Sequence, residues 1–140
     1  MRPQKQVAAL PLRRTNGVIE ILLVTSRETG RWVIPKGWLS KRVERYEAAA
    51  REAREEAGVK GKIGQRAIGS YSYIKRETSD RGPISVNVYL LAVSKEYKRW
   101  PEEDQRRRAW FAIETAAGEV QEPELSSIIK ALGALELATN

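Results

Sequence analysis

The 140-residue sequence predicts an α/β (α+β) fold, an α/β/α sandwich in which a mixed β-sheet lies between helices. Short apolar runs bounded by turn residues recur along most of the chain and indicate strands. One segment rich in Ala, Glu and Arg interrupts these runs and is typical of a helix. A C-terminal segment carries apolar residues at helical spacing. Strands mixed with two helices favour a single sheet covered by helices on its faces.

The first elements form a predicted β-hairpin. Its strands are the apolar runs Val7 to Leu12 and Ile19 to Thr25, and Asn16-Gly17 between them is typical of a tight hairpin turn. We therefore expect the two runs to pair antiparallel.

A short strand and the most secure helix come next. Trp32 to Ile34 is a brief apolar run that a proline ends, and Lys36-Gly37 opens what we expect to be a polar, positively charged loop. From Glu44 to Ala57 the composition switches to strong helix formers, and Gly58 supplies the C-terminal stop.

The second half of the chain predicts further strands and a closing helix. Two long β-like stretches, Lys62 to Lys75 and Ile84 to Tyr97, precede a loop over Arg99 to Gln105. The short apolar run Ala109 to Ile113 follows, and Glu122 to Leu137 has apolar residues at helical spacing.

Size and composition indicate one domain over residues 1–140. The chain has a mass of 15.8 kDa, and it contains 41% apolar and 31% charged residues, close to globular averages. Its longest apolar runs are far shorter than the roughly 20 residues that cross a bilayer. The N-terminus lacks the features of a signal peptide. We expect a cytoplasmic protein without a membrane span, a monomer or a homodimer.

The absence of cysteine and histidine narrows the possible chemistry. The sequence contains neither residue, which excludes disulfides, thiolate nucleophiles, Ser-His-Asp catalysis and zinc sites built from Cys or His. Catalysis would have to rest on carboxylates, Lys, Arg, Tyr, Ser and a hard metal ion. The net charge of +7 favours anionic partners such as polyphosphates, nucleotides or nucleic acid.

Three carboxylates share one face of the predicted helix. At about 100° per residue, Glu52, Glu55 and Glu56 fall within one sector, apart from an apolar stripe that includes Ala49, Ala53 and Ala57. A solvated helix face is the ordinary interpretation of such a set. Like charges at these spacings repel one another, however, and oxygen ligands suit Mg²⁺ or Mn²⁺. We therefore expect the three glutamates to bind a metal ion.

These residues resemble the Nudix box. The pattern of that family is G-x5-E-x7-R-E-U-x-E-E-x-G-U with U apolar, and the segment Gly37 to Val59 follows it, matching at every position from Arg51 onward. The resemblance implies a Nudix-like sandwich. It also implies a metal-dependent hydrolase in which water attacks phosphorus and cleaves a phosphoanhydride bond.

One position departs from the family pattern. The first Glu of the box falls on Val43, so Glu44 or Glu47 is the candidate to replace its contact with Arg51. The departure leaves open a non-catalytic module of the same fold that binds nucleotides or nucleic acid.

Motifs outside the box resemble the branch that hydrolyses diphosphoinositol polyphosphates and diadenosine polyphosphates. They are Arg31 to Gly37, Gly58 to Gly61 and Arg106 to Phe111, with Ala109 where that branch commonly has Glu. The resemblance implies a small-molecule substrate, either a diadenosine polyphosphate or an inositol pyrophosphate. An RNA 5′-pyrophosphohydrolase or a nucleoside triphosphate pyrophosphatase would use the same box. RNA is not favoured, because no aromatic and basic track for a single strand is evident.

The candidate site combines the box with two further groups of residues. Family members often draw another carboxylate from a later loop, so Glu102, Glu103 and Asp104 compete with the box glutamates for the role of general base. Phosphate groups would be held by basic side chains that flank the box. The candidates are Glu52, Glu55 and Glu56 for catalysis and metal binding, Arg51, Glu103 and Asp104 for catalysis, and Arg27, Lys36, Gly37, Lys41, Arg42 and Arg107 for substrate binding.

Overall fold

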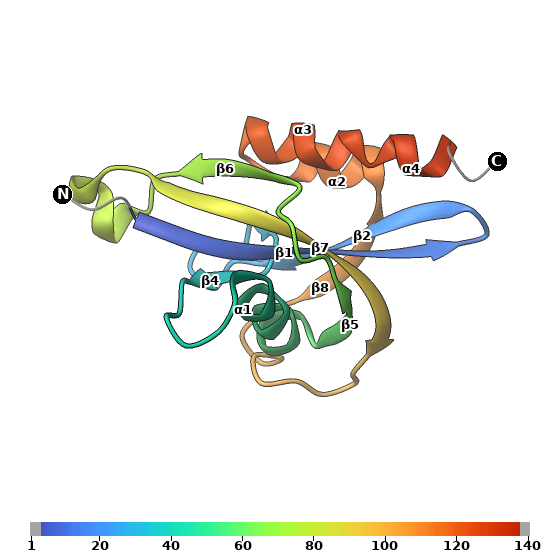
Figure 1. Ribbon diagram of the computed structural model, residues 1–140, viewed down its shortest axis with the longest axis horizontal. Helices are drawn as coiled ribbons and strands as arrows, with labels where there is room; N and C mark the ends of the chain where they lie inside the picture. The colour runs from blue at the N-terminus through green and yellow to red at the C-terminus, as the bar shows by residue number, and fades with distance from the viewer. Residues whose placement is uncertain (1–3, 138–140) are drawn as a thin grey trace.

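A computed structural model describes residues 4–137 and confirms the predicted fold class. A mixed eight-stranded sheet lies between helices, with α1 below it and α2, α3 and α4 above it in Figure 1. The strands are β1 (Gln4–Thr15), β2 (Val18–Thr25), β3 (Trp32–Val33), β4 (Lys36–Trp38), β5 (Val59–Ile63), β6 (Gly69–Tyr73), β7 (Ile84–Glu96) and β8 (Arg108–Ala112). The helices are α1 (Arg45–Glu52), α2 (Ile113–Glu119), α3 (Pro123–Ala131) and α4 (Gly133–Leu137), with a π-helical turn η1 (Ala53–Ala57) and a 3₁₀ segment η2 (Arg76–Arg81).

The long strand β1 organises the sheet. Along one edge it pairs in parallel with β7, and along the other it pairs antiparallel with β4 near its start and with β2 near its end. The predicted hairpin is confirmed, because Asn16 and Gly17 both have positive φ between the paired residues Thr15 and Val18, as a type I′ turn requires. Since β2 and β4 share one edge of β1, the sheet splits between them.

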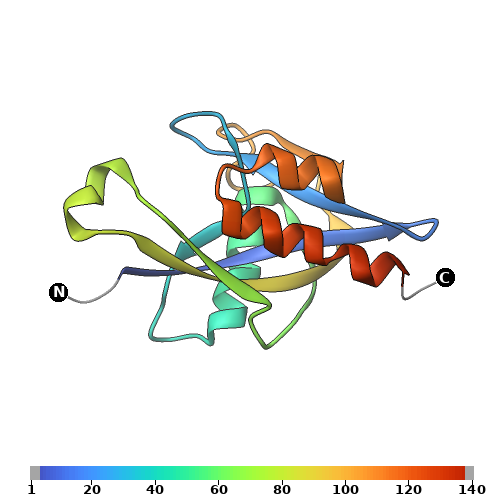
Figure 2. The ribbon, with the colours of Figure 1, turned by 90° about the horizontal axis from the view of Figure 1, so that it is seen from above.

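The core lies on both faces of the sheet. Helix α1 and the turn η1 that continues it form the box helix. Strand β1 is buried on both sides, with Val7 and Ala9 facing the box helix and Leu10 and Leu12 facing α2 and α3. Figure 2 shows α3 and α4 lying across the strands on the face opposite α1. Ala49, Ala53 and Ala57 are fully buried, so their small side chains let the box helix pack close to the sheet, as the sequence predicts.

Four expected elements differ in the structure. Lys36 and Gly37 belong to strand β4, not to a loop, because β1 offers free backbone groups at Gln6–Ala8. The expected strand over residues 62–75 is two strands, β5 and β6, that pair with different parts of β7. Helix α2 continues directly from β8, where only an apolar run was expected. The closing helix is interrupted at Leu132, between α3 and α4.

The described residues include no helix that is both long and apolar enough to span a membrane.

Candidate active site

The candidate site lies at the split in the sheet. The end of β2, the start of β4 and the end of the box helix meet there, and they bring Thr25, Lys36 and Glu56 together. The Lys36 backbone N–H donates to Glu56 Oε1 at 3.2 Å. A Cβ at position 37 would collide with the carboxylate of Glu52, so a side chain there would displace that carboxylate. The first glycine of the box therefore gives the Glu52 carboxylate room against β4.

Two carboxylates of the helix form a closely spaced pair. Glu56 is only 7% exposed, and Glu52, one helical turn earlier, is partly buried and hydrogen-bonded to it. Burial, followed by the charges of Glu56 and Glu55, raises the pKa of Glu52 to about 7. Burial also raises the pKa of Glu56, against the opposing charge of Arg106. Both carboxyl groups therefore keep their protons to a higher pH than an exposed glutamate does.

Arg106 is the main basic partner of these carboxylates, and sequence analysis did not select it. Its side chain is 9% exposed. It donates to Glu102 Oε1 at 2.7 Å and to the Thr25 carbonyl at 3.1 Å, and its Nη2 lies 3.5 Å from Glu56 Oε2. Glu102 and Arg106 lie four residues apart, and a single turn closed by the Arg106 N–H on the Glu102 carbonyl at 3.1 Å brings their side chains together.

The loop that carries Glu102 is docked on the box helix. The Glu102 backbone N–H donates to the Glu55 carbonyl at 3.1 Å, and the negative charge of Glu102 contributes to the raised pKa of Glu52 and Glu56. Glu103 instead lies 3.8 Å from the exposed Arg99, and Asp104 is exposed. Of the three loop carboxylates, the structure thus brings Glu102 to the site.

The end of the box helix is closed by two side chains that sequence analysis also missed. Trp100 Nε1 donates to the Glu56 carbonyl at 3.0 Å, and Arg108 donates to the Ala57 and Gly58 carbonyls at 2.9 and 3.3 Å. Gly58 has φ 66° and no room for a Cβ beside these two side chains. Because a helix end leaves carbonyls without partners, these contacts fix the turn that bears Glu55 and Glu56.

The predicted phosphate-binding residues are spread over three places. Lys36 is at the site, with its Nζ 5.2 Å from the centre of the Tyr73 ring, and burial lowers its pKa although the charge of Glu56 opposes the shift. Arg27 and Arg107 are exposed near the end of β2, where Arg27 contacts Gln105 and Arg107 lies over Trp32. Lys41 and Arg42 lie in the loop before α1, and the structure does not bring them to Glu56.

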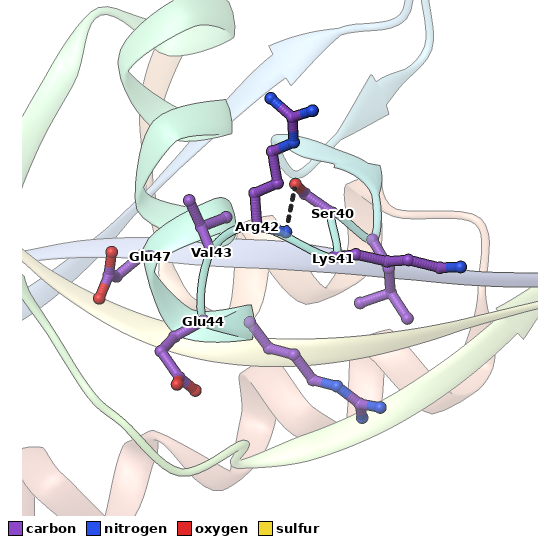
Figure 3. A pocket seen from close by; sticks show the side chains of 8 residues that line it. Ser40, Lys41, Arg42, Val43, Glu44 and Glu47 are labelled. Carbon is purple, nitrogen blue, oxygen red and sulfur yellow. Dashed lines mark hydrogen bonds between the residues drawn. The ribbon is translucent and has the colours of Figure 1, made fainter.

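That loop borders an open hollow of about 610 Å³ at the N-terminal end of α1, away from Glu56. Lys41 and Arg42 line it, and Arg42 N–H donates to Ser40 Oγ at 3.2 Å (Figure 3). Val43, which replaces the first box glutamate, is partly buried against the core beneath the helix.

Arg51, the box arginine, is exposed. In the described range it forms no ion pair with Glu44 or Glu47, so the expected replacement contact is absent.

The carboxylates fit a hard divalent cation in their chemistry. Over residues 4–137 no three acidic side chains are already gathered as a metal cluster. Glu52 and Glu56 nevertheless provide an oxygen-only pair whose mutual repulsion a cation would relieve, with Glu55 on the same turn and Glu102 beside it. These four residues are the ones that could hold Mg²⁺ or Mn²⁺.

Comparison with known proteins agrees with this geometry. The sequence profile of the NUDIX domain matches residues 2–132. Nudix hydrolase 16, mitochondrial, of Arabidopsis thaliana is 38% identical over 111 residues, which cover 76% of this chain and 61% of the relative. Human diphosphoinositol polyphosphate phosphohydrolase 3-beta is 37% identical over 115 residues, covering 80% of this chain and 66% of the relative. The chain therefore spans less than two thirds of the length of these relatives.

Solved structures show the same fold. A Caenorhabditis elegans Ap4A hydrolase in a binary complex superposes with a TM-score of 0.77 at 24% identity, covering 98% of this chain and 99% of the other. The fold, the box at the split in the sheet and the match of the domain over nearly the whole sequence lead to one conclusion: the chain belongs to the Nudix domain family.

Proposed function

We propose that the protein is a metal-dependent hydrolase that cleaves a phosphoanhydride bond by attack of water at phosphorus. The observation that carries the proposal is the pair Glu52 and Glu56, which lies where the sheet splits. The pKa of each is raised, mainly by burial and for Glu52 also by the neighbouring carboxylates. The Arabidopsis and human relatives are identical to this chain at more than a third of the aligned positions. Both are named as hydrolases, which supports the same reaction class.

Each part of the site has a role in this reaction. Glu52, Glu55 and Glu56 would hold Mg²⁺ or Mn²⁺, which when bound neutralises phosphate oxygens and activates water. A carboxylate of the site would accept the water's proton, since the chain has no histidine. Lys36 and Arg106 place positive charge beside the carboxylates, and Arg106 keeps Glu102 and Glu56 in position. Arg27 and Arg107 are placed to contact more distant phosphates.

The preferred substrate that we propose is a diadenosine polyphosphate or an inositol pyrophosphate. The name of the human relative supports an inositol-linked substrate, and basic residues on separate elements around the site favour a substrate with several phosphates. We also propose a cytoplasmic location, although two of the relatives are named as mitochondrial.

The experiment is Mg²⁺-dependent phosphate release by three variants with matched charge changes. Glu55→Gln and Glu56→Gln should each lower turnover by about 10²-fold or more. Loss of a residue that only orients a metal ligand lowers activity by about 10- to 100-fold, and loss of the ligand itself should lower it at least as much. Glu47→Gln, an exposed position on the same helix, is the control and should retain activity. Near-normal turnover by both site variants at saturating Mg²⁺ would reject the assignment.

A further inference from the structure

A second group of charged side chains surrounds Tyr97, at the end of β7. Arg54 comes from the π-helical turn, Lys60 from β5 and Lys95 from β7, so three elements converge on one tyrosine. The Arg54 guanidinium lies 3.9 Å and Lys95 Nζ 4.7 Å from the centre of its ring, and Lys60 hydrogen-bonds its hydroxyl. Figure 1 shows β5 running beside the end of the box helix. We call these four residues the Tyr97 cluster.

The positive charge of the Tyr97 cluster is not neutralised. Within residues 4–137, none of its three basic side chains takes part in an ion pair. The neighbouring Glu96 is engaged elsewhere, because it accepts from Trp110 Nε1 at 2.9 Å and lies 3.8 Å from Arg108. Desolvation opposes the shift, yet the Lys60 hydrogen bond and the charges of Lys60, Lys95 and Arg54 lower the pKa of Tyr97. The cluster therefore has a positive electrostatic potential.

Two features of the cluster cost stability, and the cation–π contacts of Arg54 and Lys95 with the ring offset part of that cost. Lys60 and Lys95 face each other directly across the β5–β7 pair, where like charges are destabilising. Arg54 Nη1 is buried and has no hydrogen-bond partner among the described residues. The Tyr97 N–H, by contrast, donates to the Gly58 carbonyl at 2.8 Å and holds the ring beside the helix. Opposed lysines and an arginine beside a ring that the backbone holds in place favour the binding of an anion here.

We propose that the Tyr97 cluster binds a chain of two or three phosphates, at a site separate from the box carboxylates. Arginine offers paired donors and the two lysines offer point charges, which suits a group with several negative charges. Single-stranded RNA is disfavoured, since Arg54 and Lys95 already contact the tyrosine ring on which a base would stack. None of the ion pairs or side-chain hydrogen bonds of Glu56 and Glu102 involves the Tyr97 cluster. Binding of an anion at the cluster is therefore independent of the proposed hydrolysis.

The test is a titration of the ¹⁵N-labelled protein with inorganic tripolyphosphate, followed by amide chemical shifts. Metal is removed beforehand with a chelating resin, because soluble chelators are themselves polyanions. We expect saturable shifts at Lys60, Gly61 and Tyr97. The double variant Lys60→Gln with Lys95→Gln should bind about tenfold more weakly or worse, and its spectrum away from the cluster should match that of the wild type.

A control with the same change of net charge is Lys75→Gln with Lys130→Gln, on the η2 side of the sheet and on α3, and it should bind nearly as the wild type does. The inference is overturned if the two double variants lose affinity equally, if the shifts do not saturate, or if an RNA oligonucleotide binds at the cluster while tripolyphosphate does not. Glu56→Gln should bind tripolyphosphate normally, so loss of hydrolysis in that variant and loss of binding at the cluster are separate results.

Discussion

At the scale of single residues, Glu52 gives the site its clearest electrostatic signature. Its side chain lies against Gly37 and Glu56, with Glu55 and Glu102 close enough to add their charge. A carboxyl group in such surroundings keeps its proton until the pH is nearly neutral. The same crowding that destabilises the metal-free site would favour a bound cation.

This signature predicts how stability depends on pH without metal. The pKa of Glu52 is raised from 4.5 to about 7 in the folded protein, so between these values the folded state binds a proton that the unfolded state does not. Its contribution to stability is therefore complete below pH 4.5 and is lost as the pH rises toward 7. Thermal unfolding in metal-free buffer should show a midpoint that falls less steeply over this window in Glu52→Gln than in the wild type. Glu47→Gln is the matched control, and identical slopes in all three proteins would contradict the assignment.

At the scale of elements, the connection from β7 into β8 determines where the glutamates lie. The loop between β7 and β8 carries Glu102, Arg106 and Trp100, and Arg108 begins β8 itself. The loop and the first residue of β8 bind the carbonyl end of the box helix and also provide a carboxylate and its partner to the site. The loop is thus both a structural support and a source of charge.

The first prediction at this scale concerns the loop carboxylates. Glu102→Gln should lower kcat by about 10²-fold with little change in KM, because a group that assists proton transfer acts mainly in the transition state. Glu103→Gln and Asp104→Asn should stay near wild-type rates, since their side chains lie apart from the carboxylates. Steady-state kinetics on one substrate suffices, and a large loss confined to Asp104→Asn would show that this loop is arranged differently during turnover.

The second prediction concerns the closure of the box helix. Trp100→Phe keeps an aromatic side chain, although a smaller one, and removes the indole N–H that donates to the Glu56 carbonyl. A buried acceptor left without a partner costs about 1 to 3 kcal/mol. Denaturant unfolding should show a loss of that size in the free energy of unfolding. Trp38→Phe is the control, because Trp38 is 47% exposed and should change stability by less than about 0.5 kcal/mol. Equal effects at the two positions would mean that the hydrogen bond does not stabilise the helix end.

Sequence patterns located most elements but not the contacts between them. The hairpin at Asn16-Gly17 and the box helix follow from local signals, namely turn chemistry and helix composition. Strand β4 could not be predicted, because three residues beginning with Lys36 become a strand only when β1 leaves an edge free. The role of Trp100 was equally hidden, since nothing near it in the sequence shows that it meets a carbonyl 44 residues earlier.

At the scale of the whole molecule, charge is distributed unevenly. The chain has a net charge of +7 yet brings Glu52, Glu55, Glu56 and Glu102 to the split in the sheet. Basic side chains lie around that site and in the separate Tyr97 cluster. Such a distribution attracts polyanions, and the carboxylates at the split in the sheet would bind a cation that balances their charge.

This distribution predicts that the length of the phosphate chain matters. Arg107→Ala should impair a substrate with four or more phosphates more than a nucleoside triphosphate, by about tenfold in kcat/KM, because only the longer chain reaches beyond the carboxylates to the end of β2. Arg66→Ala, an exposed arginine in the β5–β6 connection, is the control. Equal losses on both substrates would place Arg107 outside the contacts that distinguish them.

The proposed function is hydrolysis of a phosphoanhydride at this Nudix site with a bound divalent metal. Its most direct test is phosphate release by the wild-type protein, with and without Mg²⁺, from a diadenosine polyphosphate, an inositol pyrophosphate, a nucleoside triphosphate and 5′-triphosphate RNA. We predict release that requires the metal, with kcat/KM for one of the first two substrates about tenfold or more above that for the triphosphate. Binding of these compounds with no metal-dependent release from any of them would contradict the claim and identify a non-catalytic module.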